Sequence, residues 1–487
     1  MKKSIVACAV AFLLPAFLMV NCSPAFRKGE KIQVGKQMIS KFWTLEGTEI
    51  NADTLILEKA GASLISRFNT KNFILSAQIH TTSGAEGVLS FHAGTASDLP
   101  QQGYSVMINN SDYRQGSPQK TGSLSLIRNN YVRTAIEDQW FNLRIEVLGN
   151  HIKVFVNEKI VSEYVQPDNP MRIQGLEGMV TGVGKMIIKK TNESGRILLG
   201  EILLELLDDQ LAVETDSSFI QDSTGEMLTR LNQKGFPVID YHGHLKGGLT
   251  VDQITRHGRL MGYNYGIAPN CGLNFPVTND SSLLAYYNEM VAEPVFKAMQ
   301  CEGREWITLF TPDIIARYDY IFTDAMTWTD HKGRRMRLWI PEETFVDDEQ
   351  QFMDMLVGKI EAVLSQEPVD IYVNPTYLPG IIAAEYDRLW TTERMDRVIR
   401  VLVENDVALE INSRFKIPSI AFIKRAKAAG VKFTLGTNNG SNDDLGRLEY
   451  SLKVIQEAGI TEEDMFIPRP SGDKKVTKKG LPLKITG

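Results

Sequence analysis

Two histidines placed two residues apart are the clearest sign of chemistry in this chain of 487 residues. They belong to the stretch VIDYHGHLKGG (residues 238–248), in which an apolar run ends in Asp240 and is followed by His242 and His244. Side chains alternate along a strand, so both imidazoles are expected to point to one side, where they could share a metal ion. The same two side chains are the best candidates for a general base, because imidazole titrates near neutral pH.

Polar residues follow several later apolar runs in the same way. Runs such as VDIYVNPT, VALEINS and VKFTLGTNN alternate with amphipathic stretches such as TERMDRVIRVLVEND between residues 236 and 470. This alternation predicts a parallel sheet or barrel, whose functional residues collect at the carboxyl ends of the strands. We expect Glu410 there as an acid or an orienting group for the histidines. The candidate ligand-binding residues at these strand ends are Lys246, Asn270, Asn374, Asn412, Arg414, Asn438 and Asn439.

The segments that carry these residues resemble, in order, the PHP (polymerase and histidinol phosphatase) family. The resemblance rests on IDYHGHLKGGLTVDQITRHGRLMGYNYGIAPN, IIARYDYIFTDAMTW, VDIYVNPT and VALEINSRFKIPSIAFIKRAKAAGVKFTLGTNNGSNDDLGRL. It implies a distorted (β/α)7 barrel over residues 236–470. Members of the family hold up to three metal ions and hydrolyse phosphoesters, so a metal-dependent phosphoesterase is one of the functions to consider.

Most of the metal ligands that this resemblance implies are replaced. The opening His-x-His is kept, but Asn270 and Asn374 stand where the family has histidines, and residues 437–440 read Thr-Asn-Asn-Gly in place of Ser-Asp-Ala-His. Neutral amides are weak ligands and cannot balance the charge of several dications. A trinuclear hydrolytic site is therefore not expected.

Two alternatives remain for the pocket. One is a mononuclear site in which His242 and His244, with Asp324 or Glu410, hold one divalent ion such as Zn, Mn or Fe. The other is a metal-free pocket, rich in hydrogen-bonding groups, for a polyhydroxylated ligand or a single anionic group. A third interpretation is purely structural, because asparagines also satisfy turns at strand ends.

Residues 38–205 predict an all-β jelly-roll sandwich. Short alternating runs such as FILSAQIHTT and GVLSFHAG are separated by Gly, Asn, Asp and Ser clusters, and VLGNHIKVFVN indicates a hairpin with Gly149-Asn150 in its turn. In order and spacing, NFILSAQIHTTSGAEGVLSFHAG, WFNLRIEVLGNHIKVFVNEKIVSEY and GLEGMVTGVGKMIIKKTNESGRIL resemble the 3-keto-disaccharide hydrolase-like domain, which is lectin-like. Members are implicated in cleaving glycosides oxidised at C3 of the sugar, and others are accessory modules.

Five polar residues are candidates to line the concave face of this sandwich, namely Glu86, His92, Ser105, Asn109 and Arg114. The alternative is that they occupy an ordinary solvated face. The sequence departs from the family at Ala85-Glu86-Gly87 and at Ser105, which puts catalysis by the sandwich alone in doubt.

The N-terminus predicts export. MKKSIVACAVAFLLPAFLMVNC has two lysines, an apolar stretch shorter than the roughly 20 residues of a membrane span, and a cysteine at its end. Residues 1–22 resemble a bacterial lipoprotein signal, which implies lipidation of Cys22 and attachment to the membrane at the cell envelope. Asn21 departs from the small residue usual before that cysteine, so plain secretion is the alternative.

The remaining segments carry weaker signals. Residues 206–235 predict a connector with a short helix, and residues 471–487 a loose basic tail. Cys271 and Cys301 either form one disulfide or are two buried thiols. The stretch WTDHKGRRMRLWIP predicts a hairpin with solvated charges, and the alternative is a loop over the barrel mouth that stacks a sugar.

Together these patterns predict an envelope-attached, two-domain protein that handles saccharides. The formal net charge of -6 gives no reason to expect nucleic acid as a partner. A hydrolase or lyase that acts on glycosides such as 3-keto-disaccharides is the first hypothesis. The alternatives are a non-catalytic glycan-binding protein and the phosphoesterase considered above.

Overall fold

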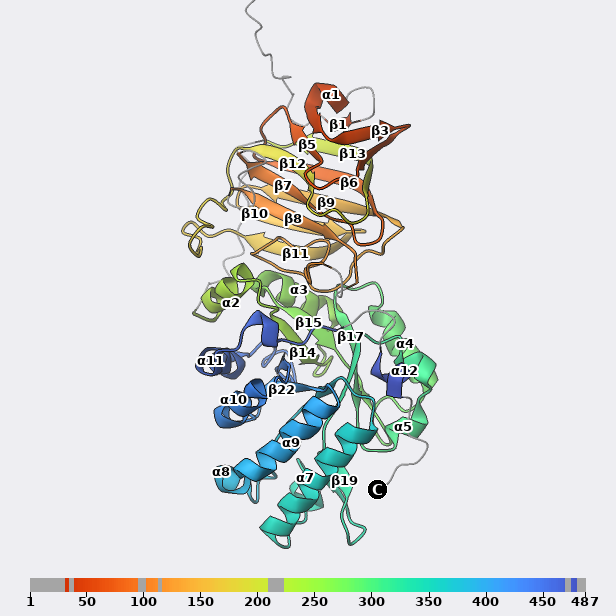
Figure 1. The fold of residues 1–487 in the computed structure, drawn as a ribbon, viewed down its shortest axis with the longest axis vertical. Helices are drawn as coiled ribbons and strands as arrows, with labels where there is room; N and C mark the ends of the chain where they lie inside the picture. The colour runs from red at the N-terminus through yellow and green to blue at the C-terminus, as the bar shows by residue number, and fades with distance from the viewer. Residues whose placement is uncertain are drawn as a thin grey trace, which may run out of the picture.

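The computed structural model describes residues 31–34, 39–94, 102–112, 116–208, 223–468 and 474–479. The expected signal peptide, Cys22 and Arg114 lie outside these ranges. Within them, a β-sandwich is followed by a barrel of parallel strands surrounded by helices, and the sandwich lies against one end of the barrel (Figure 1). None of the helices in these ranges is long and apolar enough to span a bilayer.

Two antiparallel sheets form the sandwich, as the sequence predicts. One sheet has the order β11-β10-β9-β6-β13-β4-β3, with β1 beside β13, and the other has the order β2-β5-β12-β7-β8. Every second residue of β6 from Phe73 to Thr81 is buried, which is how an alternating strand contributes to the core between two sheets. The hairpin between β9 and β10 turns at Gly149, where φ is 62° and glycine is favoured.

The elements of the sandwich are β1 (Lys31–Val34), α1 (Ile39–Phe42), β2 (Trp43–Glu46), β3 (Thr48–Asn51), β4 (Thr54–Leu57), β5 (Ser63–Ser66), β6 (Phe73–Thr81), β7 (Glu86–Ala93), β8 (Tyr104–Asn109), β9 (Trp140–Leu148), β10 (His151–Val156), β11 (Lys159–Val165), β12 (Lys185–Lys190) and β13 (Ile197–Leu206).

The second half is a closed parallel barrel of seven strands. The sheet order is β15-β14-β23-β22-β21-β18-β17-β16, and pairing of β15 with β17 closes the barrel and leaves β16 as an extension. The distorted (β/α)7 architecture expected from the sequence is therefore confirmed. The strands are β14 (Ile239–Gly243), β15 (Asn264–Ile267), β16 (Asn270–Cys271), β17 (Phe296–Cys301), β18 (Tyr320–Thr323), β21 (Ile371–Tyr372), β22 (Ala408–Asn412) and β23 (Phe433–Gly436), and a separate hairpin is formed by β19 (Thr327–Thr329) and β20 (Arg335–Arg337).

Helices follow the strands where the amphipathic pattern predicts them. For example, α3 begins after Thr250, whose side chain and that of Gln253 form a capping box, and ends at Gly262, where φ is 88°. The helices are α2 (Ser223–Gln233), α3 (Val251–Met261), α4 (Asp280–Met290), α5 (Trp306–Leu309), α6 (Pro312–Ile315), α7 (Glu349–Gln366), α8 (Tyr386–Leu389), α9 (Thr392–Glu404), α10 (Ile420–Ala428), α11 (Glu449–Ala458) and α12 (Lys475–Lys479), with 3-10 turns at Pro341–Glu343, Ala383–Glu385 and Glu462–Asp464.

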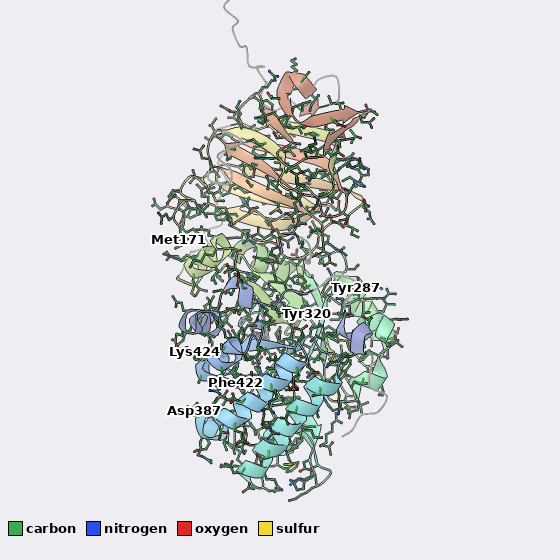
Figure 2. All side chains as sticks on the ribbon, viewed as in Figure 1. Met171, Tyr287, Tyr320, Asp387, Phe422 and Lys424 are labelled. Carbon is green, nitrogen blue, oxygen red and sulfur yellow. The ribbon has the colours of Figure 1, made fainter. Side chains whose placement is uncertain are left out.

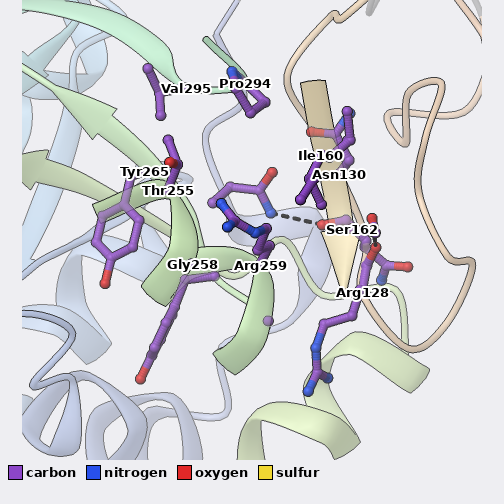
Figure 3. Close-up of a pocket in the computed structure, with 15 residues that line it drawn as sticks. Arg128, Asn130, Ile160, Ser162, Thr255, Gly258, Arg259, Tyr265, Pro294 and Val295 are labelled. Carbon is purple, nitrogen blue, oxygen red and sulfur yellow. Dashed lines mark hydrogen bonds between the residues drawn. The ribbon is translucent and has the colours of Figure 1, made fainter. Parts of the chain in front are cut away.

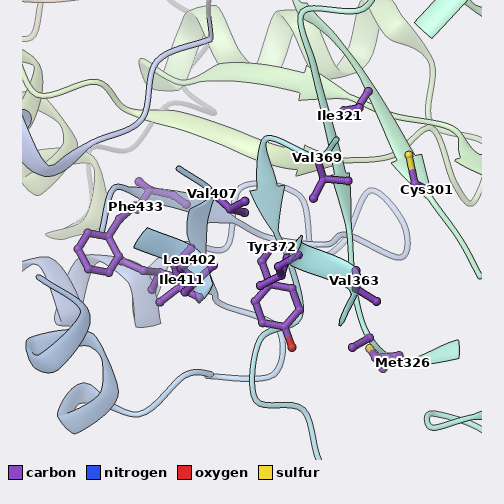
Figure 4. Packing of buried hydrophobic residues seen from close by; sticks show 14 of the residues in the cluster. Cys301, Ile321, Met326, Val363, Val369, Tyr372, Leu402, Val407, Ile411 and Phe433 are labelled. Atoms are coloured by element: carbon purple, nitrogen blue, oxygen red, sulfur yellow. The ribbon is translucent and has the colours of Figure 1, made fainter. Parts of the chain in front are cut away.

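Strand alternation sorts the barrel residues into an outer and an inner row. Met299 and Cys301 of β17 and Ile321 of β18 pack outward in the large core that the helices share, part of which Figure 4 shows. The inner row of β17 starts with Phe296 and Ala298, which belong to a separate apolar cluster. Continuing this alternation brings polar side chains to the inner face at the carboxyl end of the barrel.

A loop of the sandwich closes the opposite, amino-terminal end of the barrel. Tyr131 and Val132 are buried in the same apolar cluster as the first residues of β14, β17, β18, β21 and β22. The Tyr131 backbone N–H donates to Asn264 Oδ1 at 3.0 Å, and its hydroxyl donates to the Gly235 carbonyl at 3.1 Å. The sandwich therefore contributes part of the barrel core.

Polar contacts extend this interface on the surface of β11 and α3. Arg259 donates to Glu163 at 3.1 Å, and Arg128 donates to the Leu260 carbonyl at 2.7 Å. The cavity left between these elements has a volume of about 30 Å³, room for about one water molecule (Figure 3). At its other side the sandwich reaches α2, where Gln233 donates to the Met171 carbonyl at 2.9 Å (Figure 2).

The C-terminal segment differs from the loose tail that its basic composition predicts. Residues 475–479 form α12, and Lys475 and Lys479 donate to backbone carbonyls such as those of Asn405 and Leu364, at 2.5 and 3.0 Å. The lysines are used here as hydrogen-bond donors that fasten the segment to the barrel, a role that charge composition does not reveal.

Candidate functional site

A cavity of about 530 Å³ opens at the carboxyl ends of the barrel strands, and we call it the barrel-mouth cavity. Its size and place are those expected of a small-molecule site in a barrel. Six of the candidate residues line it, and strand-end position brings them together from across the sequence. The lining residues are Lys246, Asn270, Phe275, Pro276, Gln300, Glu302, Asp324, Met326, Trp339, Asn374, Tyr377, Arg414, Phe415 and Asn438.

Two buried carboxyl groups, Glu302 and Asp324, stand on one wall of this cavity. Asn270 donates to Glu302 Oε1 at 2.7 Å, while Glu302 Oε2 has no hydrogen-bond partner in the described residues. Burial, together with the neighbouring Asp324, raises the pKa of Glu302 to about 8. Glu302 is therefore largely protonated at neutral pH.

Asp324 accepts more hydrogen bonds than Glu302, which stabilises its ionised form. Its Oδ1 accepts from the Met326 backbone N–H at 3.0 Å and its Oδ2 accepts from Asn374 Nδ2 at 3.0 Å. Burial raises the pKa of Asp324, and these bonds and nearby Arg304 oppose that shift. Because Asp324 accepts two hydrogen bonds and Glu302 accepts one, the negative charge is favoured on Asp324 and the proton on Glu302.

Glu302 is the functional candidate that the sequence motifs do not reveal. It matches no His- or Asn-bearing motif, and it follows the buried Cys301. The signal that finds it is alternation, because Phe296, Ala298, Gln300 and Glu302 occupy successive inward positions of β17 and its end, changing from apolar to polar.

Asparagine amides connect the strand ends beneath the cavity. Asn374 Oδ1 accepts from Asn412 Nδ2 and from Asn438 Nδ2, each at 3.0 Å. Asn439 accepts from the His244 backbone N–H at 2.7 Å and donates to the His244 carbonyl at 3.0 Å. Asn412 and Asn439 are fully buried and do not line the cavity, so for these two the structural interpretation fits and ligand contact does not.

His242 and His244 lie below the cavity with 0% and 1% of their surface exposed. His242 Nδ1 is 2.6 Å from Glu410 Oε1, and His244 Nδ1 donates to the Ala268 carbonyl at 2.8 Å. Burial and the nearby Lys246 lower the pKa of His244 well below its usual value, so its ring is neutral. Glu410 also accepts from the Asn374 backbone N–H at 2.6 Å.

The expectation that one of these histidines acts as a general base on the ligand, with Glu410 as acid, needs correction. Neither His242, His244 nor Glu410 lines the barrel-mouth cavity, and all three are essentially inaccessible. A group that transfers a proton must come within hydrogen-bond reach of the ligand. Their bonds instead tie β14 to β22 and to the β21 loop, which supports the cavity floor.

The residues present do not fit the metal centre of PHP-type barrels. The Nε2 atoms of His242 and His244 are buried and without partners, with ring centroids 5.1 Å apart, so two imidazole ligands are available. However, the described residues hold no group of three His, Cys, Asp or Glu side chains arranged for an ion. Glu410 is committed to His242, Asn374 and Asn412.

Two cations, Lys246 and Arg414, stand at the rim of the same cavity. Lys246 is half-buried and makes no hydrogen bond within the described residues, and burial lowers its pKa. Arg414 Nη1 donates to the Asn438 carbonyl at 2.8 Å and lies 3.8 Å from Asp444.

Aromatic rings form the remaining wall. Tyr377 and Phe415 pack edge to face with centroids 4.9 Å apart, and Trp339, which is 37% exposed, also lines the cavity. Trp339 follows the β19–β20 hairpin, whose cations pair with acidic residues, for example Arg334 with Asp330 at 2.7 Å. The expected hairpin is thus present, and its tryptophan also meets the cavity.

The candidate binding residues of the sandwich form hydrogen bonds within the sandwich itself. His92 Nε2 binds the Lys71 carbonyl at 2.8 Å, its Nδ1 accepts from Gly182, and burial lowers its pKa to about 4. Asn109 is fully buried, with its amide bonded to Ser117, Gln119 and Ser111. The expectation that these two side chains line an open face is wrong, because every polar atom already has a protein partner.

Glu86 is only partly buried, but it has a structural role as well. Its Oε1 accepts from the Ser117 backbone N–H at 2.8 Å. Ser105, where the sequence departs from the family, bonds Ser90 at 2.8 Å inside the sheet.

Cys271 and Cys301 are two separate buried thiols, not a disulfide. They are register partners on β16 and β17. Burial raises the pKa of each thiol well above its usual value, so neither is a ready nucleophile.

Both halves of the chain are similar to known proteins. Residues 33–200 match the family model of the 3-keto-alpha-glucoside-1,2-lyase-like domain, which confirms the resemblance expected for the sandwich. Probable phosphatases of Thermoanaerobacter sp. and Thermoanaerobacter pseudethanolicus are each 33% identical over 101 residues, which is 19% of this chain and 41% of the relative. The chain thus spans about two fifths of the curated relatives it matches. With the closed seven-stranded barrel, this match supports the PHP-like resemblance of the C-terminal part.

Solved structures similar to this chain fall into the same two groups. The histidinol phosphate phosphatase of Lactococcus lactis is 16% identical, with 46% of this chain and 95% of that chain covered and a TM-score of 0.36. A Parabacteroides distasonis protein described as a glycosyl hydrolase is 9% identical, with 34% and 89% covered and a TM-score of 0.31. A carbohydrate binding module from Bacillus subtilis is 13% identical, with 34% and 94% covered and a TM-score of 0.25.

Proposed function

We propose that this chain is a carbohydrate-active protein, and that it cleaves glycosides, 3-keto-glycosides among them, in the barrel-mouth cavity. The observation that carries the proposal is that Glu302, whose pKa is raised to about 8, and Asp324 line one cavity together with the partly exposed ring of Trp339. An acid and a base in one cavity are what cleavage of a glycosidic bond needs. The family match of the sandwich supports a sugar as the substrate class.

The chemistry of a 3-keto-glycoside suits these two groups. The ketone at C3 acidifies the hydrogen on C2, which Asp324 removes as general base. The electron pair forms the C1–C2 double bond, the bond from C1 to the leaving oxygen breaks, and Glu302 donates its proton to that oxygen. Addition of water to the double bond would complete a net hydrolysis.

A test compares Glu302→Gln and Asp324→Asn with wild type, by the release of sugar from a panel of glycosides and 3-keto-glycosides. Each substitution keeps the side-chain shape and removes the titrating group, so we expect a loss of roughly 100-fold or more. Glu342→Gln, at an exposed glutamate outside the cavity, is the matched control and should retain full activity. Equal rates for Glu302→Gln and Glu342→Gln would contradict the proposal.

Two other functions are separated by the same experiment. A glycan-binding protein without turnover would bind saccharides and release no product in any variant. A phosphoesterase is favoured by the curated relatives, which are probable phosphatases. Amide side chains at the ligand positions oppose it, and metal-stimulated release of phosphate from a phosphoester would revive it.

We also propose attachment to the cell envelope through Cys22, on the basis of the N-terminal sequence alone. The test is incorporation of labelled palmitate into wild type and into Cys22→Ala. Label in both proteins, or in neither, would contradict lipidation at this residue.

A further inference from the structure

We infer that the ligand of the barrel-mouth cavity is an acidic saccharide, one that carries an oxyanion group which Lys246 and Arg414 bind together. This inference rests on the proposed function and specifies its substrate class. It follows from four features of the cavity, which are two cations with unused donors, the arrival of these cations from two strand ends, an aromatic lining and an unpartnered carboxyl oxygen.

The first feature is that both cations have donors to spare. Lys246 has neither a hydrogen bond nor an ion pair within the described residues, although it is half-buried and Glu302 is close enough to affect its pKa. Arg414 is 45% exposed, donates from Nη1 to the Asn438 carbonyl and lies 3.8 Å from Asp444, and its Nε and Nη2 donate to no described residue. Partial burial of the Lys246 ammonium without a partner costs free energy, and a bound anion would offset that cost.

The second feature is that the two cations reach the cavity from different strands. Lys246 follows β14 and Arg414 follows β22, so two different strand ends deliver a cation to one cavity. An oxyanion accepts several charge-assisted hydrogen bonds at once, and the fork of an arginine beside a lysine ammonium matches that geometry. The amides of Asn270 and Asn438, which line the same cavity, suit the hydroxyl groups of the rest of the ligand.

The third feature is the aromatic wall next to the cations. Phe415 directly follows Arg414, whose guanidinium lies 5.8 Å from the Phe415 ring centroid, and Tyr377 packs on Phe415. A sugar ring has apolar C–H faces that stack on such rings. A ligand with one ring face, several hydroxyls and one negative group therefore fits the cavity better than a neutral sugar or an inorganic anion.

The fourth feature is the unpartnered Oε2 of Glu302 in the same cavity. A buried carboxyl oxygen without a hydrogen bond is uncommon in a folded protein. Protonated Glu302 would donate to a ligand oxygen, so this atom gains a partner when the saccharide binds.

The test is binding of a matched pair of ligands, methyl glucopyranoside and methyl glucopyranosiduronic acid, measured by calorimetry on the full chain. The two differ only in the carboxylate at C6. We expect the acid to bind roughly tenfold tighter or more, because charge-assisted hydrogen bonds are the strong ones. Lys246→Met and Arg414→Gln should each remove most of this preference, which is read as the ratio of the two affinities in each variant.

Controls and probes separate the outcomes. Lys424→Met on the outer face of α10 (Figure 2) and Arg447→Gln each remove one exposed positive charge away from the cavity, and both should keep the preference. Arg414→Lys should restore part of it. The 6-sulfate and 6-phosphate of the same glucoside identify which oxyanion is preferred.

Equal affinity for the acidic and neutral sugars would overturn the inference and leave the proposed function intact. A preference that survives both Lys246→Met and Arg414→Gln would overturn the assignment of these residues. Failure of every sugar to bind would contradict the proposed function as well.

Discussion

Nδ1 of His242 lies 2.6 Å from Oε1 of Glu410, and this contact joins β14 to β22 inside the barrel. The other oxygen of Glu410 accepts from the Asn374 backbone N–H and from Asn412 Nδ2, at 2.6 and 3.0 Å. One carboxylate therefore fixes three strand ends at once. His242 and Glu410, which the sequence suggests as catalytic groups, support the cavity from beneath. The residues that line the cavity are the ones that can contact a ligand.

Replacing Glu410 tests this supporting role. Glu410→Ala leaves three buried donors without an acceptor, so we expect the free energy of unfolding to fall by about 3 to 5 kcal/mol. Urea denaturation followed by circular dichroism measures it. Glu342→Ala, at an exposed site, should change stability by less than about 0.5 kcal/mol. Equal stability of the two variants would show that the network contributes little.

The pKa of Glu302 predicts a pH dependence of stability. Burial and Asp324 raise it from 4.5 to about 8, so the folded state holds a proton that the unfolded state releases. The stabilisation from protonated Glu302 is therefore complete below about pH 4.5 and is lost as pH rises through about 8. The charged groups Asp324, Lys246 and Arg304 also influence the pKa of Glu302. The variant used for comparison must therefore keep all three of them.

Urea titrations at several pH values check this prediction. The free energy of unfolding of wild type should fall more steeply between pH 5 and 8 than that of Glu302→Gln, which cannot titrate. Parallel pH profiles for the two proteins would mean that Glu302 keeps an ordinary pKa.

The buried Tyr131 predicts that the sandwich and barrel unfold together. Tyr131→Ala removes a ring from the amino-terminal core of the barrel and leaves a cavity, so we expect a loss of about 3 to 5 kcal/mol. Because Tyr131 belongs to the sandwich and packs in the barrel core, the unfolding temperatures of the barrel and of the sandwich should fall by the same amount. Ile136→Ala, at a side chain 50% exposed, is the control. Destabilisation of the sandwich alone would contradict a shared core.

Trp339 predicts where a saccharide contacts the protein. Trp339→Ala removes the exposed ring at the cavity and should weaken sugar binding by roughly tenfold, with the fold unchanged. Trp140, which is 50% exposed on the sandwich, is the matched control, and Trp140→Ala should bind as wild type does. The reverse result would move the binding site to the sandwich.

The sequence predicts those parts of the structure that follow from the periodic spacing of apolar residues in strands and helices. Alternating strands such as VALEINS and following helices such as α9 are local patterns, so the barrel, the sandwich and the strand-end location of Lys246, Asn270 and Arg414 could be foreseen. Which strand-end side chains stay accessible depends on packing between distant segments. Burial of the histidines and the insertion of Tyr131 are consequences of that packing, which no spacing in the sequence encodes.

The most direct test of the central claim uses leaving-group ability. Glu302→Gln and wild type are compared on two 3-keto-glucosides, one with an alkyl alcohol and one with 4-nitrophenol as leaving group. An alkyl alcohol needs a proton to depart, whereas 4-nitrophenolate departs without one, so an acid role predicts a loss of roughly 100-fold or more on the first substrate and below about tenfold on the second. Equal losses on both substrates, or none on either, would contradict Glu302 as the acid of the barrel-mouth cavity.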